Sequence, residues 1–375
     1  MTDTLFFILE NPDCRSLELC KYSINYESTK FDSKEYEKAR GVKFKNRKEA
    51  YNDWLCNGRP LGTAYNRSSN SLLRIILKAK DEPELIEAWL QHHGNLVGYD
   101  NIIIMDTGST SKEYLDILER YKNDVIIFDY KKHYNALHNP KVNRELFELL
   151  SISSKYLMVL DADEFLFCFD EGELTSVLPS QMLAESEEEI FCGTWLNNLF
   201  PAEFDLDGKL DLSKSYCFDI SGDRIKSGTI AGKSIVKSST SKSLSHIGHN
   251  LHSQQNYKLI TSNSFGKFFI LHFDNLGKEL TQKRIKKHLA TQGFNTELLS
   301  LFESGKELLD YVKKNNFEVP SPRVVKYINS YYYRHELKGE SDSIRIDLYN
   351  GVDDEDVYSL QSLVYNTNWM SFLND

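Results

Sequence analysis

The stretch KYLMVLDADEFLFCF, at residues 155–169, decides how the chain folds. Its apolar run at residues 156–160 ends abruptly at the acids of Asp161-Ala162-Asp163-Glu164. A continuous apolar run of this length predicts a strand buried on both faces, which is typical of a parallel sheet in an α/β protein. Open sheets of this kind bind ligands outside the carboxyl ends of their strands, so the acids lie where a site is expected.

Asp161 and Asp163 alternate, so in extended geometry both side chains leave the backbone on one side. Two carboxylates on one side repel each other unless a cation lies between them. Mg²⁺ and Mn²⁺ take oxygen ligands and often share them with substrate phosphates. A solvated turn is the alternative for an isolated Asp-x-Asp, but its place at the end of an apolar strand favours a metal site.

The composition limits the class of protein. A chain of 375 residues, 41% of them hydrophobic, can bury a large core and has room for two domains. A formal net charge of −10 argues against a general nucleic-acid-binding protein, which would carry a basic face. The 6 cysteines are scattered without a CxxC, which predicts neither a zinc site nor a disulfide framework and favours a reducing compartment. No apolar run reaches the length of a membrane span, so we expect a cytoplasmic protein with at most peripheral contact to the inner face of a membrane.

Strands and helices are predicted to alternate along the middle of the chain. Apolar runs predict strands at residues 72–77, 101–105, 125–128 and 156–160. Helical patterns lie between them at residues 84–93, 112–121 and 142–151. This order predicts a Rossmann-like, mostly parallel α/β sheet flanked by helices, with right-handed crossovers.

Three parts are expected along the chain. Residues 1–70 form a small N-terminal helical module, residues 71–300 the α/β domain, and residues 301–375 a mainly helical C-terminal tail. A basic amphipathic helix is predicted at residues 280–289. Its basic face could meet an anionic membrane or a lipid-diphosphate acceptor, and a solvated face is the alternative.

Two stretches resemble a known enzyme family. KAKDEPELIEAWLQHHGNLVGYDNIIIMDTGSTS, at residues 78–111, and KYLMVLDADEFL, at residues 155–166, are similar to GT-A glycosyltransferases, above all to family 2-like and family 92 enzymes. The shared features are Asp-Glu after a strand, a helix with Trp and His, D-x-G-S-T, and D-A-D-E-F. Ser111 stands where the family usually has Asp, and Asp81 where Asn is commoner. A shorter stretch at residues 31–62 resembles a helical module found beside bacterial glycosyltransferase domains.

The resemblance implies a metal-dependent, inverting glycosyltransferase with a GT-A-like fold. Such an enzyme moves a sugar from a nucleotide-sugar, here a UDP-sugar, to a glycan or lipid-linked acceptor in bacterial surface polysaccharide synthesis. It implies Mn²⁺ or Mg²⁺ as cofactor, ligated by Asp163, with Asp161 binding ribose or metal-bound water. The metal would neutralise charge on the departing nucleoside diphosphate.

The donor pocket is expected at the strand ends near Asp161. The first-strand loop is placed to touch base and ribose, and Asp106 can accept hydrogen bonds from either. Ser109 could bind the nucleotide or cap the next helix. Lys233 could approach a phosphate, because a similar Gly-Lys-Ser-Ile strand lies beside the donor site in the resembling family; a solvated lysine is the alternative. The expected nucleotide-binding residues are Ala79, Lys80, Glu82, Asp106, Ser109, Asp161 and Lys233.

GT-A enzymes commonly complete metal binding with a histidine downstream of the sheet. The resemblance therefore adds His252 and His272 as candidate ligands, with His252 ranked slightly first and a structural histidine as the alternative. Trp195, at the end of a predicted strand, would lie near the acceptor or else pack in the core.

An inverting transferase needs a general base opposite the leaving group. The candidates are Asp219, Asp223 and Glu203, and the sequence does not choose among them. Two other functions stay open: a non-catalytic sugar-nucleotide-binding module of a polysaccharide assembly complex, and a nucleotidyltransferase. Binding without turnover would distinguish the first of these from a transferase.

Overall fold

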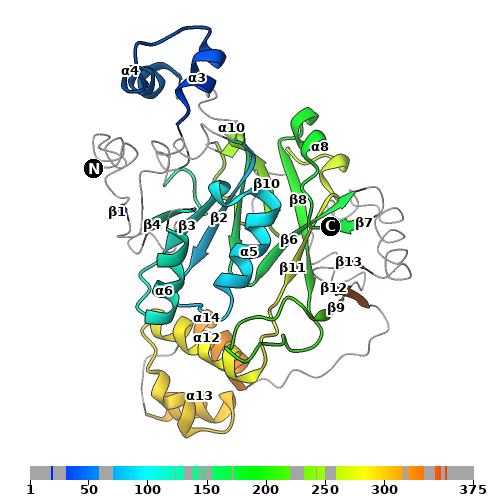
Figure 1. Cartoon of the computed structure of the whole chain (residues 1–375). Helices are drawn as coiled ribbons and strands as arrows, with labels where there is room; N and C mark the ends of the chain where they lie inside the picture. Colours follow the sequence, from blue (N-terminus) through cyan, green and yellow to red (C-terminus); the bar gives the residue numbers. More distant parts are fainter. Residues whose placement is uncertain are drawn as a thin grey trace.

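The computed structural model describes residues 18–19, 31–58, 71–122, 124–130, 138–142, 147, 154–170, 173–219, 232–241, 243–249, 259–315, 320–332, 343–347 and 351–352. Asp223, His252 and most of the helix predicted at residues 142–151 lie outside these ranges. Within them the chain is a mixed α/β molecule built on one open sheet of 10 strands (Figure 1). No helix in the described ranges is both long and apolar enough to cross a membrane.

The parallel part of the sheet holds the strands that the sequence predicts. They are β4 (Ile126–Asp129), β3 (Ile102–Asp106), β2 (Ser71–Ala79) and β5 (Ser154–Asp161), neighbours in that order. Every residue of β3 is buried, as expected for a strand covered on both faces. The connecting helices are α5 (Ile86–Val97), between β2 and β3, and α6 (Lys112–Tyr121), between β3 and β4.

The rest of the sheet is mixed. Beyond β5 come β10 (Ser234–Lys237), β8 (Ile190–Asn197), β11 (Phe268–His272), β6 (Glu164–Asp170) and β7 (Glu173–Thr175). In this half β8 and β11 are parallel, while β10 and β6 are antiparallel to their neighbours. A short strand, β1 (Glu18–Leu19), lies antiparallel to β4 at the other edge. The parallel arrangement predicted for the sheet therefore holds for its central strands and not for the whole of it.

The chain passes from one half of the sheet to the other at the acids. β5 ends at Asp161 and β6 begins at Glu164, yet β10, β8 and β11 lie between these two strands in the sheet. β10 and β6 are antiparallel to their neighbours. The first residues of β10 and β6 therefore lie on the same side of the sheet as the carboxyl ends of β2, β5, β8 and β11. The acids thus stand at a switch point, where open sheets bind ligands.

Two helical groups flank the sheet domain, at opposite ends in Figure 1. α3 (Ser33–Arg40) and α4 (Arg47–Asp53) pack around Tyr36 and Trp54. α12 (Lys278–Thr291), α13 (Gly305–Lys314) and α14 (Pro322–Tyr332) share an apolar cluster that includes Leu289, Leu308 and Ile328. The shorter elements are η2 (Trp54–Gly58), η4 (Tyr99–Asn101), α8 (Ser180–Glu185), α10 (Ser238–Ser241), η6 (Ser262–Ser264) and η7 (Thr296–Leu301).

The described residues of the C-terminal tail hold strands in addition to the helices α13 and α14. β12 (Ser343–Asp347) pairs with β9 (Ser215–Asp219) and with β13 (Gly351–Val352) in a separate sheet of 3 strands. The sequence SIRID alternates polar and apolar residues, which is the period of a strand.

Candidate functional site

A cavity of about 520 Å³ opens at the edge of the sheet where the acids lie. It is bounded by the ends of β2, β5, β8 and β11 on one side and by α12 and α14 on the other. Its lining residues are Lys78, Ala79, Lys80, Glu82, His138, Asp161, Asp163, Glu164, Trp195, His249, His272, Arg284, Lys287, His288, Arg323 and Tyr327. The predicted site residues that it brings together are Ala79, Lys80, Glu82, Asp161, Asp163, Trp195 and His272.

Asp163 lies in the turn between β5 and β6 and is almost fully buried. Its Oδ2 accepts a hydrogen bond from Nη1 of Arg284 at 2.5 Å and lies 3.5 Å from Nε2 of His272. Burial alone would raise the pKa of Asp163, but Arg284 and His272 outweigh it and hold that pKa below its ordinary range. In return Asp163 outweighs the effect of burial on His272 and raises the pKa of that imidazole to about 9.

His272 reaches Asp163 because of strand pairing. β11 pairs with β6 so that His272 lies opposite Glu164, the residue that follows Asp163. Nδ1 of His272 donates to Oδ1 of Asn197 on β8 at 2.9 Å, which turns Nε2 toward Asp163. Of the two histidines expected near a metal, His272 therefore lies in the cavity, and His252 is outside the described residues.

Asp161 is held by a buried lysine. Nζ of Lys233 donates to Oδ2 of Asp161 at 2.8 Å and lies 3.5 Å from Oε2 of Glu164. The Lys233 side chain is only 1% exposed, so it is neither solvated nor part of the cavity lining. Burial would lower the pKa of Lys233, but the two carboxylates raise it above its ordinary value. Lys233 is thus an internal counter-ion behind the acids.

Glu164 connects three elements of the site. Its Oε2 accepts a hydrogen bond from the backbone N–H of Asp161 at 2.7 Å, and its Oε1 accepts one from Nε1 of Trp195 at 2.9 Å. Burial raises the pKa of Glu164 to about 7, against the opposing effect of Lys233. The fixed indole of Trp195 stacks on His272, with ring centroids 4.8 Å apart. Trp195 is therefore a wall of the cavity rather than a residue of the central core.

The loop between β2 and α5 is tied to the D-T-G-S-T-S loop after β3. The backbone N–H of Asp81 donates to Oγ of Ser109 at 3.0 Å, and Oδ1 of Asp81 accepts from the backbone N–H groups of Thr110 and Ser111, each at 2.7 Å. Ser109 in turn donates to Oδ1 of Asp106 at 2.5 Å. These contacts brace the loop that carries Lys80 and Glu82 into the cavity.

The bracing network gives two predicted nucleotide-binding residues, Asp106 and Ser109, contacts within the protein. Asp106 and Ser109 do not line the cavity, because their polar groups face the two loops. The side chain that caps α6 belongs to Ser111, and not to Ser109. The contact of Asp106 and Ser109 with a nucleotide stays a prediction, and neither residue lines this cavity.

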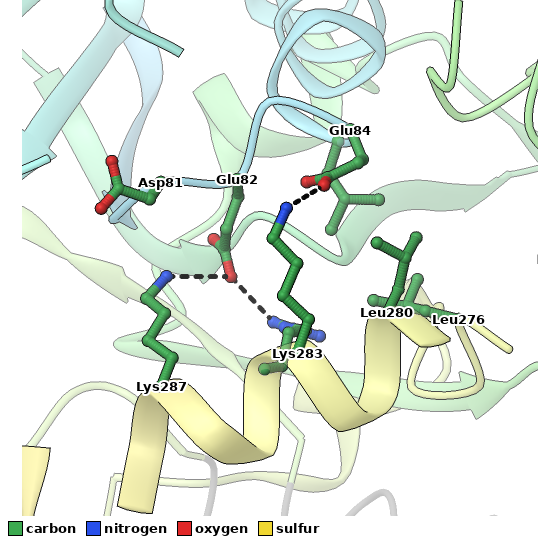
Figure 2. A pocket seen from close by; sticks show the side chains of 9 residues that line it. Asp81, Glu82, Glu84, Leu276, Leu280, Lys283 and Lys287 are labelled. Atoms are coloured by element: carbon green, nitrogen blue, oxygen red, sulfur yellow. Dashed lines mark hydrogen bonds and ion pairs between the residues drawn. The ribbon is translucent and has the colours of Figure 1, made fainter. Parts of the chain in front are cut away.

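The other side of the same loop faces α12. Figure 2 shows Lys283 directed toward Glu84 and Lys287 toward Glu82, around a second, smaller cavity of about 140 Å³ with Leu276 and Leu280 in its wall. Oε1 of Glu82 lies 3.2 Å from Nη2 of Arg284 and 4.0 Å from Nζ of Lys287. Arg284 therefore bridges two carboxylates, Glu82 and Asp163.

Neither of the two candidate general bases that the structure describes lines the cavity. Glu203 is exposed, and Asp219 is buried on β9; neither lines the cavity, and Asp223 lies outside the described residues. Among the described residues the carboxylates that line it are Glu82, Asp161, Asp163 and Glu164.

Sequence reasoning missed the wall made by helices and His138. The lining residues that were not predicted are Lys78, His138, Glu164, His249, Arg284, Lys287, His288, Arg323 and Tyr327. A signal existed for α12, where Arg284, Lys287 and His288 are spaced three and four residues apart and so share a helical face. No comparable pattern marks His138, Arg323 or Tyr327.

A divalent cation fits this site in part. Asp163 and His272 offer an oxygen and a nitrogen 3.5 Å apart in the cavity wall. No group of three His, Cys, Asp or Glu side chains in the described part of the chain is arranged to hold a metal. A cation bound there would be held by Asp163 and His272, and it would compete with Arg284 for the Asp163 carboxylate.

No protein-family model and no curated protein matches the chain. Among solved structures it is similar to TarS of S. aureus, a glycosyltransferase, with 12% sequence identity and a TM-score of 0.28. The match covers 58% of this chain and 40% of TarS. A likeness at this level shows neither a shared fold nor a shared activity, so the function proposed next stands on the site itself.

Proposed function

We propose that the cavity binds a nucleotide-sugar, and that the protein is a glycosyltransferase acting on a glycan or lipid-linked acceptor in surface polysaccharide synthesis. One observation carries the proposal. Asp161 and Asp163 both reach a cavity at the switch point of the sheet, and the opposite wall of that cavity is basic and aromatic. This combination suits a nucleotide-sugar. Carboxylates can accept hydrogen bonds from its hydroxyls, basic side chains can bind its diphosphate, and aromatic rings can stack on its base or its sugar.

The charge of the cavity supports an anionic ligand. Its cationic lining residues are Lys78, Lys80, Arg284, Lys287 and Arg323. Its carboxylates are Glu82, Asp161, Asp163 and Glu164, and they are partly neutralised by Arg284 and the buried Lys233. The chain as a whole has a formal net charge of −10, so these cations do not reflect a basic overall composition. Its volume of about 520 Å³ lies in the range of small-molecule sites.

The two ends of the cavity fit the two ends of the donor. Lys80 and Asp161 lie at the ends of the adjacent strands β2 and β5, where Asp161 can accept a hydrogen bond from ribose. Trp195 lies farther along the sheet edge on β8, and its ring suits the face of a sugar. We therefore propose that the nucleoside lies toward β2 and the transferred sugar toward β8.

Asp163 and His272 would hold Mn²⁺ or Mg²⁺, which when bound neutralises charge on the leaving nucleoside diphosphate. Only neutral imidazole is a metal ligand, and Asp163 raises the pKa of His272 to about 9. A cation must therefore displace a proton, and cation affinity should rise as the pH increases toward that value. The check is the Mn²⁺ concentration giving half-maximal turnover between pH 6 and 9. A value independent of pH would contradict metal binding at His272.

A screen of sugar nucleotides with and without Mn²⁺, read as transfer or hydrolysis, tests the proposal. Asp163→Asn should lower turnover at least a hundredfold, because it removes the charge that ligates the cation. Asp207→Asn, at an exposed carboxylate outside the cavity, is the matched control and should keep full turnover. Nucleotide binding without any turnover would favour a non-catalytic binding module. Turnover by Asp163→Asn equal to that of the parent protein would contradict the proposed role of Asp163.

A further inference from the structure

The wall opposite the acids belongs to a helical unit with its own core. α12, α13 and α14 pack around Leu289, Leu308 and Ile328, in a cluster separate from that of the sheet. From this unit Arg284, Lys287, His288, Arg323 and Tyr327 reach the cavity. The cavity therefore lies between two packed bodies, with the carboxylates mostly on one and a row of basic side chains on the other.

Charged contacts fix this wall in place. Arg284 joins α12 to Asp163 and Glu82, while Lys283, as Figure 2 shows, joins it to Glu84. Nζ of Lys287 donates to the backbone carbonyl of Lys80, which brings Lys287 to the rim formed by the β2–α5 loop. A basic group of α12 thus lies beside the loop expected to hold the nucleotide.

Arg323 is held in the wall by aromatic rings rather than by a carboxylate. Its guanidinium lies over the ring of Tyr327, 5.9 Å from the centroid. Tyr327 is stacked on His288 of α12, with centroids 5.2 Å apart and planes 8° from parallel. In the part of the chain that the structure describes, Arg323 and Lys80 line the cavity without a carboxylate within 4.0 Å.

We propose that Lys287 and Arg323, on the helical wall opposite Asp161 and Asp163, form a diphosphate-binding subsite together with Lys80 of the β2–α5 loop. The inference rests on the proposed function, since a nucleotide-sugar supplies such a diphosphate. Guanidinium and ammonium groups bind phosphate oxygens by charge-assisted hydrogen bonds, and the planar guanidinium matches two oxygens at once. The stack of Arg323 on Tyr327 fixes that plane before the ligand arrives, which reduces the entropy lost on binding.

The diphosphate could belong to the nucleotide donor or to a lipid-diphosphate acceptor, and the ligands of the experiment separate the two. Calorimetric titration of the full chain would use inorganic pyrophosphate, UDP, uridine and a short isoprenyl diphosphate. Tighter binding of UDP than of pyrophosphate assigns the subsite to the donor. Tighter binding of the isoprenyl diphosphate than of pyrophosphate assigns the subsite to the acceptor. Either result supports a diphosphate subsite.

The variants are Lys287→Ala and Arg323→Ala, with Lys326→Ala as the control on an exposed face of α14 outside the cavity. Each cavity variant should weaken pyrophosphate and UDP about tenfold, as expected for loss of a hydrogen bond to a charged group. Uridine binding should not change, and Arg323→Lys should restore part of the affinity. Thermal melting checks that each variant is folded.

The experiments distinguish a failure of the diphosphate subsite from a failure of the transferase proposal. If pyrophosphate binds and is lost in both variants while no sugar nucleotide is turned over, the subsite stands and the transferase proposal fails. If sugar nucleotides are turned over and both variants bind UDP as tightly as the parent protein, the transferase stands and the subsite is wrong. Failure of the parent protein to bind any of the diphosphates would also overturn the subsite.

Discussion

Glu164 and Lys233 set the charge and position of the acids from behind. Lys233 contacts Asp161 and Glu164, and Glu164 holds both the backbone of Asp161 and the indole of Trp195. Each of these groups is shielded from water in part or in full, so each depends on its partner in the protein. The site is therefore pre-formed around one buried carboxylate.

Glu164→Ala should lower the free energy of unfolding by about 3 kcal/mol, because it leaves a buried ammonium with one carboxylate fewer and an indole N–H without an acceptor. Glu164→Gln keeps the acceptor toward Trp195 and should lose less. Urea unfolding of both variants measures the difference, with Asp207→Ala as an exposed control. Midpoints equal to that of the parent protein for both Glu164 variants would show that the network carries no stability.

At the scale of elements, the loops after β2 and β3 form one braced unit. Asp81 has a positive φ of 48°, an unusual backbone for a residue other than glycine, and its side chain accepts from two backbone N–H groups of the neighbouring loop. Asp81 does not cap the helix that follows it, because α5 begins at Ile86 without a side-chain cap. The carboxylate stabilises the neighbouring loop instead.

Asp81→Ala should lower stability by about 1–2 kcal/mol, because Thr110 and Ser111 lose the acceptor of their backbone N–H groups. Asp81→Asn keeps an oxygen in the same place and tolerates a positive φ, so it should remain close to the parent protein. Thermal unfolding of the pair makes the comparison. An Asn variant as destabilised as the Ala variant would mean that charge, rather than the acceptor, holds the loops together.

For the whole molecule, local pattern predicted the parallel strands and the place of the acids. The apolar runs became β2, β3, β4 and β5, and α6 spans the residues expected for it. Whether such a segment is a strand or a helix depends mainly on the order of apolar and polar residues within it, and that order can be read from the sequence. The D-A-D-E stretch could be placed at a sheet edge for the same reason.

What closes the site could not be predicted, because it depends on pairing between distant segments. β10, β8 and β11 enter the sheet between β5 and β6, and this alone brings Lys233, Trp195 and His272 to the acids. Arg284 is 121 positions from Asp163 in the chain. Whether the basic face of α12 met solvent, a membrane or the acids depended on how its helical unit packs, and no local pattern specifies that.

A crystal structure with UDP and Mn²⁺, using anomalous scattering to locate the metal, tests most directly whether the cavity is a metal-dependent nucleotide-sugar site. We predict a manganese peak within coordination distance of Asp163 and His272, with the diphosphate in the cavity between the β5–β6 turn and α12. A nucleotide bound away from the D-A-D-E turn, with the ion pairs of Asp161 and Asp163 unchanged, would contradict this prediction.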